Sequence, residues 1–179
     1  MRKLLTVIVI CLFGTGLPGC GGSEGVKPEE VVVGNTIPDF SLKSLDGKTV
    51  DKSSLKGQVV VLNFWASWCA PCMSEIPELK EFAANSKAKV VGIALDETGL
   101  ETVKPFVESR GINYTVLVGN QEIFQQFNGV GIPYTLILDR SQHIINIHRG
   151  PVSRESLEDD LRTVEQGAVA LGGGASGGR

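Results

Sequence analysis

An apolar run from Val59 to Trp65, interrupted only by Asn63, lies in the first half of the chain. A Val-rich run of this length suits a strand that is buried on both faces, as in the interior of a parallel sheet. The run is followed by Trp68-Cys69-Ala70-Pro71-Cys72, and apolar residues then recur at helical spacing at Ile76, Leu79, Phe82 and Ala83. This pattern predicts a strand that leads directly into an amphipathic helix, with Cys69 at the junction.

Two further strand-like segments, 89–96 and 115–118, are separated by a helical pattern. That helix is expected to end near Gly111, and its buried face is predicted to carry Leu100, Val103, Phe106 and Val107. Asn120 suits the N-cap of a following helix, whose inward residues are predicted to be Ile123, Phe124 and Phe127.

The two ends of the predicted domain each contain a hairpin. Segments 134–138 and 143–147 are expected to pair across residues 139–142, and Ser153 is expected to cap a last helix with Leu157, Leu161 and Val164 inward. At the other end, Asp46-Gly47 is a strong turn signal between two short extended segments. The chain therefore alternates strands and helices between two hairpins.

The first residues have the features of a bacterial targeting segment. Two basic residues precede an apolar block, 4–13, which is too short for a membrane-spanning helix of about 20 residues. Leu17-Pro18-Gly19-Cys20 then resembles a lipoprotein box, which implies cleavage before Cys20 and acylation of its thiol, although Pro18 is an unusual occupant. An ordinary secretory signal with a chance cysteine, or an uncleaved anchor, is the alternative.

Composition divides the chain into four parts. We expect a signal peptide over 1–19, a flexible tether over 20–33, one folded domain over 34–166 and a disordered Gly-rich tail over 167–179. The whole chain has 17 basic and 20 acidic residues, and the leader carries two of the basic ones. A mildly acidic domain without a basic stripe argues against nucleic acid as a partner.

Processing leaves Cys69 and Cys72 as the only thiols available for chemistry, because Cys11 departs with the leader and Cys20 is acylated. Half of a zinc knuckle and a structural bridge are the plain alternatives for a Cys-X-X-Cys pair. Zinc needs about four ligands, and the chain has no second cysteine pair. A helix N-terminus favours a thiolate over a thiol, and Pro71 fits the first helical turn. These observations indicate a redox-active dithiol.

The segment from Phe64 to Cys72 resembles the active site of the thioredoxin superfamily. Over about residues 34–164 the pattern resembles the TlpA/ResA/CcmG-like branch of membrane-tethered thiol-disulfide oxidoreductases, and Pro77 inside the helix is a further shared trait. The resemblance implies an α/β, thioredoxin-like fold: a central mixed sheet flanked by helices, with an N-terminal β-hairpin and a central helix–strand insertion near residues 100–118.

The resemblance also implies roles for residues around the cysteines. Cys69 is expected to attack a substrate disulfide, and Cys72 to resolve the mixed disulfide. The Ile132–Pro133 peptide bond is expected to be cis and to face the cysteines, with backbone groups of Ile132 free to pair with an extended substrate. The substrate-binding surface is predicted to comprise Trp68, Ala70, Pro71, Ile132 and Pro133. For Trp65, core packing is an equally simple account.

A third catalytic residue is predicted at Glu75. Thioredoxins usually have an aspartate at the position of Asn63, which cannot titrate, whereas ResA-like proteins use a glutamate in a Glu-X-Pro sequence that Glu75-Ile76-Pro77 matches. Glu75 lies on the helix face of Cys72 and is expected to accept its proton, provided that burial raises the pKa of the carboxyl. The alternative is a solvated surface glutamate.

The resulting hypothesis is a monomeric reductase of specific partner disulfides, lipid-anchored in the bacterial cell envelope and facing the periplasm. The resemblance implies apocytochrome c or copper-site proteins as partners and a membrane thiol donor of the DsbD/CcdA type as the source of electrons. It implies no cofactor and no resident metal.

Three other classes of protein share parts of this sequence pattern. A peroxiredoxin needs Pro and Thr seven and three residues before its cysteine, where this chain has Leu62 and Ala66. A Sco-like copper-delivery protein would use Cys-X-X-X-Cys with a convergent histidine; His143 and His148 are expected at the surface on opposite strand faces. A binding lipoprotein with vestigial cysteines remains the third possibility.

Overall fold

The computed structural model describes residues 30–172, which form one sheet with helices packed against it. The strands are β1 (Ser41–Ser44), β2 (Thr49–Asp51), β3 (Val60–Trp65), β4 (Lys89–Ala94), β5 (Thr115–Val118), β6 (Tyr134–Leu138) and β7 (Ile144–Arg149). The helices are a 3₁₀ helix η1 (Lys52–Leu55) and the α-helices α1 (Ala70–Asn85), α2 (Leu100–Arg110), α3 (Gln121–Gln126) and α4 (Arg154–Gly172).

The strands lie in the order β2-β1-β5-β4-β3-β6-β7, which confirms the predicted mixed sheet. β3, β4 and β5 are parallel, while the strands at the two ends pair antiparallel. All of β3 is buried, as its Val-rich pattern predicts. The predicted N-terminal hairpin forms β1 and β2, and the predicted insertion supplies α2 and β5, which joins that hairpin to β4.

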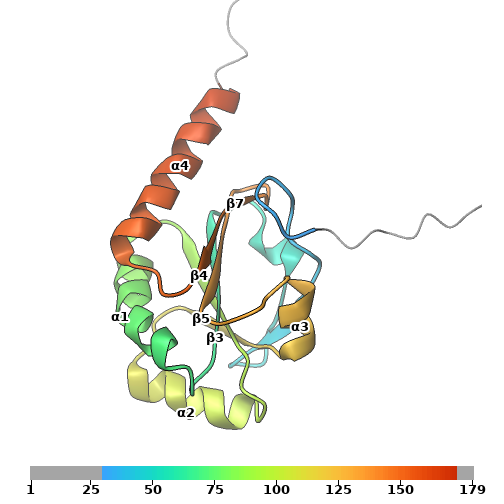
Figure 1. The fold of residues 1–179 in the computed structure, drawn as a ribbon, viewed down its shortest axis with the longest axis vertical. Coiled ribbons are helices and arrows are strands. Elements are labelled where there is room, and N and C mark those ends of the chain that lie inside the picture. The colour runs from blue at the N-terminus through green and yellow to red at the C-terminus, as the bar shows by residue number, and fades with distance from the viewer. Residues whose placement is uncertain (1–29, 173–179) are drawn as a thin grey trace, which may run out of the picture.

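Helices cover both faces of the sheet. Figure 1 shows α1 and α4 on one side and α3 on the other. Val61, Val90 and Ile137 pack beneath α1 and α4 together with Leu79, Phe82, Leu157 and Val164. The opposite face holds Leu62, Phe64 and Leu136 against Phe124 and Phe127. Alternate residues of β3 thus point to opposite apolar layers, which holds this strand rigidly at the centre of the domain.

Local capping signals mark the helix ends as predicted. Asn120 Oδ1 accepts a hydrogen bond from the Ile123 N–H, 2.9 Å away, at the start of α3. Ser153 Oγ accepts from the Ser156 N–H over 3.2 Å at the start of α4. Gly111 adopts the left-handed conformation, with φ of 56°, immediately after α2.

Leu100 departs from the predicted inward face of α2. Its side chain is 48% exposed, whereas Val103 is fully buried. Helical periodicity predicted Leu100 on the buried face because it has the same spacing as Val103 and Val107. Leu100 is the first residue of α2, however, and burial of the helix begins one turn later, at Val103.

Both predicted boundaries of the domain also need correction. Val31 packs into the core with only 3% of its surface exposed, so the folded region begins before residue 34. α4 continues to Gly172, beyond the predicted end at 166. A single glycine such as Gly167 costs a helix only about 1 kcal/mol, so it does not stop α4.

The predicted leader, the lipidation site Cys20 and the glycine run near the C-terminus lie outside the described residues. Within residues 30–172, no helix is both long and apolar enough to cross a bilayer.

Candidate active site

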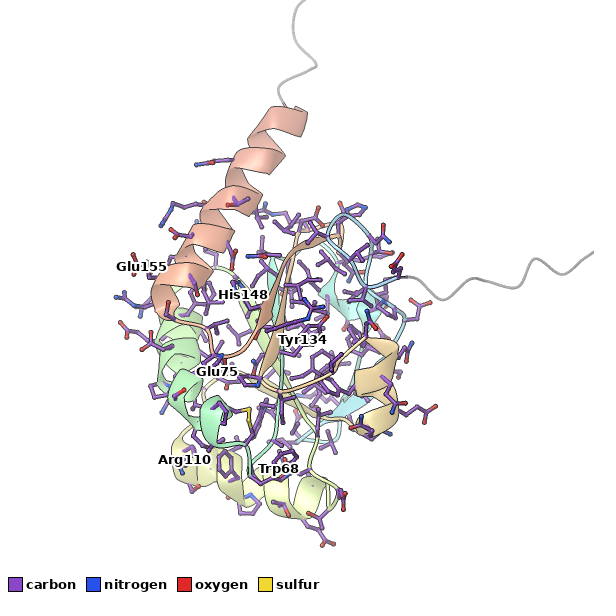
Figure 2. The ribbon with its side chains drawn as sticks, viewed as in Figure 1. Trp68, Glu75, Arg110, Tyr134, His148 and Glu155 are labelled. Carbon is purple, nitrogen blue, oxygen red and sulfur yellow. A yellow bond between two sulfur atoms is a disulfide. The ribbon has the colours of Figure 1, made fainter. Side chains whose placement is uncertain are left out.

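The cysteine pair lies where β3 passes into α1. Cys69 is the N-cap of α1, and its Sγ accepts a hydrogen bond from the Cys72 N–H over 3.3 Å. A disulfide joins Cys69 to Cys72 across the first turn of the helix, as Figure 2 shows. Only 4% of Cys69 is exposed and Cys72 is fully buried, so both cysteines are largely covered in this oxidised state.

An exposed rim surrounds the covered disulfide. Trp68 immediately precedes Cys69 and is 70% exposed, and Ala70 and Pro71 are exposed as well. Trp65 is instead a core residue: it is 1% exposed and its ring lies 5.4 Å from that of Phe106 between centroids. The two tryptophans therefore differ in role, because Trp65 is the last residue of the fully buried strand β3 while Trp68 lies beyond the strand.

The Ile132–Pro133 segment also reaches this site. The peptide bond between the two residues is cis, as predicted. Ile132 packs against the apolar cluster that contains both cysteines, although it lies about sixty residues away in sequence. Val130 beside it is 91% exposed, and together these residues border a pocket of about 310 Å³. Ile132, next to the cis peptide bond, thus belongs to the same apolar cluster as the two cysteines.

Asp96 is a site residue that sequence reasoning missed. It follows β4, is 5% exposed, and its Oδ2 accepts a hydrogen bond from the Ser67 N–H over 3.1 Å. The Ser67 hydroxyl donates to the same carboxylate. Two hydrogen bonds to one buried carboxylate hold the loop that precedes Cys69. The available signal was a carboxylate at the carboxyl end of a buried parallel strand, next to the end of β3.

Asp96 and Trp68 both border a groove of about 750 Å³, which Ser67 of the loop before Cys69 also lines. Its other lining residues are mostly polar and come from the ends of β4 and β5 and the start of α3; among them are Glu97, Thr98, Asn120 and Gln121. The rim of the redox site is therefore apolar at Trp68 and polar along this groove.

Glu75 is buried beneath the disulfide-bearing turn, with 1% of its surface exposed. Its Oε1 accepts a hydrogen bond from Asn63 Nδ2 at 2.8 Å, and its Oε2 accepts one from the Val152 N–H at 3.0 Å. Burial raises the pKa of Glu75 to about 7, against the smaller opposing effects of these two hydrogen bonds and of the His148 charge. The burial that the sequence argument required is present, and Asn63 is a hydrogen-bond donor to Glu75.

His148 corrects the expectation that both histidines are surface residues. Its side chain is only 23% exposed, and its Nε2 lies 2.6 Å from Asp160 Oδ2. His143, which precedes β7, is 46% exposed and contacts Asp139. His148 of β7 is partly covered by α4, whose Asp160 contacts the imidazole. No local pattern in the sequence indicates that α4 packs over this strand. Across residues 30–172, no three His, Cys, Asp or Glu side chains gather as metal ligands.

A reversible disulfide at the start of the helix that follows a central strand, beside a cis-proline, supports two-electron exchange with another dithiol. Fold and site together define a thioredoxin-like thiol-disulfide oxidoreductase.

Comparisons with known proteins agree. The sequence profile of the family described as Redoxin matches residues 32–164. The chain is 30% identical over 167 residues to the thioredoxin-like protein YneN of Bacillus subtilis, covering 90% of this chain and 98% of that protein. It is 29% identical over 169 residues to the thiol-disulfide oxidoreductase ResA of Bacillus cereus, covering 91% and 97%.

A solved structure of the thioredoxin family is also similar to this chain. A thiol:disulfide interchange protein of the thioredoxin family from Chlorobium tepidum superposes with a TM-score of 0.63 at 33% identity, covering 72% of this chain and 94% of that one. The chain belongs to the Redoxin family, and it is a thiol-disulfide oxidoreductase of the ResA type.

Proposed function

We propose that this oxidoreductase is a lipid-anchored, extracytoplasmic reductase that transfers two electrons to disulfides of specific partner proteins, in cytochrome c maturation or a related process. The observation that carries the proposal is the position of Glu75, a buried carboxyl with a raised pKa one helical turn after Cys72. Such a group can take the proton that the buried Cys72 thiol must lose for the enzyme to complete a reduction.

The first step forms a mixed disulfide. The Cys69 thiolate attacks one sulfur of the partner disulfide, and the other partner sulfur leaves as a thiolate. The position of Cys69 at the N-terminus of α1 supports this assignment, because the unpaired N–H groups of the first turn and the helix dipole stabilise an anion there. The Cys72 N–H already points at Cys69 Sγ.

The second step regenerates the disulfide of the enzyme. Cys72 gives its proton to Glu75, and the new thiolate attacks Cys69 Sγ, so that the partner leaves as a dithiol after protonation. An ordinary thiol pKa is about 8.5, so transfer to a carboxyl of pKa about 7 is uphill by about 2 kcal/mol, against about 6 kcal/mol for an exposed glutamate. Burial of Glu75 thus makes the resolving step feasible near neutral pH.

The exposed rim supports recognition of an extended partner segment. Trp68, Ala70 and Pro71 offer a surface next to the attacking sulfur, and Ile132 packs against the apolar cluster that contains both cysteines. Pairing of that backbone with a partner strand would place the partner disulfide in line with Cys69. A membrane thiol donor of the DsbD/CcdA type would then reduce the Cys69–Cys72 disulfide and return the enzyme to its active form.

The targeting segment and Cys20 support the proposed location in the cell envelope. Acylation of Cys20 would hold the enzyme at the membrane, and residues 21–29 would link the anchor to a monomeric domain. Location outside the cytoplasm suits the chemistry, because partner disulfides persist in that compartment.

Trapping of the partner tests the proposed function. The Cys72→Ser variant of the full-length protein, expressed in cells, should accumulate mixed disulfides whose partner is identified by mass spectrometry; the matched control is the double variant Cys69→Ser/Cys72→Ser. We expect an exported partner with a cysteine pair, such as apocytochrome c. Equal recovery with the control would contradict the proposal. Tight copper binding by the reduced protein, without disulfide turnover, would favour copper delivery instead.

A further inference from the structure

A row of polar side chains crosses the otherwise apolar sheet face beneath α1 and α4. Asn63 of β3 is the cross-strand partner of Thr135 of β6, and Thr135 is the partner of His148 of β7. Directly opposed residues in antiparallel strands point to the same face of the sheet and lie about 5 Å apart. The three side chains therefore form a row across β3, β6 and β7, with Thr135 in the middle. Asn63 Nδ2 donates to Thr135 Oγ1 over 2.9 Å.

Each end of this row meets a carboxylate from a covering helix. At the β3 end, Asn63 Nδ2 also donates to Glu75 Oε1 of α1. At the β7 end, His148 Nε2 lies 2.6 Å from Asp160 Oδ2 of α4, and Asn146 Nδ2 donates to Asp160 Oδ1 over 2.7 Å. Figure 2 shows Glu75 and His148 on the same side of the sheet, toward α1 and α4.

Stability alone does not explain this arrangement. Asp160 is 8% exposed, whereas the other buried residues of α4, such as Leu157 and Val164, belong to the apolar cluster on this face. A buried ion pair is often no more stabilising than apolar residues of the same volume, because both charges lose their hydration. Because the polar row ends at Glu75, the proposed proton acceptor, a role in proton transfer explains the row better than stability does.

We propose that His148, oriented by Asp160 and Asn146, is a positioning residue of the redox reaction that sets how readily Glu75 takes and releases the proton of Cys72. The inference rests on the proposed function, in which Glu75 is that acceptor. Its physical basis is the charge of the imidazolium, which stabilises the carboxylate form of Glu75 and opposes the effect of burial.

The other groups that face Glu75 cannot supply this effect. Asn63 and the Val152 N–H are neutral donors, and Cys72 is bound in the disulfide in the oxidised state. The buried Tyr114 hydroxyl has its pKa raised, first by burial and then by the charge of Glu75, so it stays neutral. His148 is itself faced by Asp160, Asn146 and Thr135, and Asp160 is the only other charged group among them.

The chain provides a matched control. His143 contacts Asp139 through its Nδ1, 3.3 Å from Asp139 Oδ2, so it is also a histidine beside a carboxylate. It lies before β7, at the end of the β6–β7 hairpin away from the Thr135–His148 pair, and it contacts no residue of the row. Replacement of His143 therefore changes a similar pair without changing the surroundings of Glu75.

The test follows the side-chain carboxyl signal of Glu75 by carbon NMR during a pH titration of the oxidised full-length protein. We expect His148→Gln to move the Glu75 midpoint upward by about half a pH unit, because a nearby positive charge is lost. His143→Gln should leave the midpoint in place, and His148→Lys, which keeps a positive charge, should return it toward the wild-type value. Identical midpoints in His148→Gln and His143→Gln would overturn the inference.

A second measurement separates this inference from the proposed function. In His148→Gln, the midpoint of the pH profile of the resolving rate should move upward, as the Glu75 midpoint does. In a Glu75→Gln background, His148→Gln should have no further effect on the resolving rate. If Glu75→Gln leaves the rate profile of the wild type unchanged, the proton-acceptor role fails, while the NMR midpoint still decides whether His148 controls Glu75.

Discussion

The side-chain amide of Asn63 donates a hydrogen bond to Glu75 Oε1, 2.8 Å away, in the buried layer between β3 and α1. The same nitrogen donates to Thr135 Oγ1, and the Val152 N–H holds the second oxygen of Glu75. The carboxyl is therefore fixed at both oxygens in a place that water reaches poorly. The titrating group of this site is supplied by α1, and β3 supplies the neutral residue that orients it.

The structure predicts different reactivities for the two thiols of the reduced enzyme. Iodoacetamide at neutral pH should label Cys69 first, because Cys69 caps α1 while Cys72 is fully buried. Cys69→Ser should lower insulin reduction to the uncatalysed rate. Mass spectrometry of the alkylated peptide gives the order of labelling, and earlier modification of Cys72 would reverse the roles assigned here.

Glu75→Gln should slow the resolving step by about 100-fold or more, at the lower end of general acid–base contributions, because glutamine cannot accept the proton of Cys72. The wild-type rate should rise as pH passes through about 7, where Glu75 becomes ionised, and the variant should lack this inflection. Stopped-flow measurement of partner release from a preformed mixed disulfide reports this step. Glu78→Gln, on the same helix but half-buried, is the control; equal rates in both variants would contradict the role of Glu75.

The raised pKa of Glu75 also predicts how stability depends on pH. The folded protein binds this proton more tightly than the unfolded chain, so its stability falls as pH rises from about 4.5 to about 7. Relative to Glu75→Gln, the oxidised wild type should lose about 3 kcal/mol of unfolding free energy across that interval, at 1.36 kcal/mol per pKa unit. Urea unfolding at pH 5 and pH 8 measures it; a constant difference between the two proteins would exclude the raised pKa.

Truncation of Trp68 should affect activity and leave stability nearly unchanged, whereas truncation of Trp65 should lower stability. Trp68→Ala should change stability by no more than about 0.5 kcal/mol, since the ring is exposed, but should slow reduction of a protein disulfide more than reduction of a small aromatic disulfide. Trp65→Ala should cost about 3–5 kcal/mol by leaving a core cavity. Thermal unfolding and parallel assays on the two substrates give both quantities. If Trp68→Ala slows both substrates equally, the ring does not bind the partner.

The proposed lipid anchor predicts a change of location on mutation. Cys20→Ser should release the protein from membranes or block processing of its precursor, while the domain keeps its insulin-reductase activity, because that activity depends on Cys69 and Cys72 and not on Cys20. Membrane fractionation and mass spectrometry of the N-terminal peptide provide the measurement. Full membrane retention without an acyl group would show that another feature of the chain holds it there.

Many features of this protein follow from short-range patterns and were predictable. The Val-rich strand, the caps at Asn120 and Ser153, the turn at Asp46-Gly47 and the stop at Gly111 all depend on residues within a few positions of each other. The redox pair belongs to this group, because a Cys-X-X-Cys spacing at a strand–helix junction is itself a local geometry. The cis Ile132–Pro133 bond was predicted only through family resemblance, since isolated X–Pro bonds favour trans.

The tertiary structure decided which polar residues are buried together. Glu75 is one of several glutamates on α1 by its sequence, and it differs from them because Asn63 and the Val152 N–H, 12 and 77 residues away, close over it. His148 meets Asp160 only because β7 pairs with β6 in one register and α4 crosses that face. Burial and pKa depend on what packs against a group, and that packing is set by contacts between distant segments, which a linear pattern does not contain.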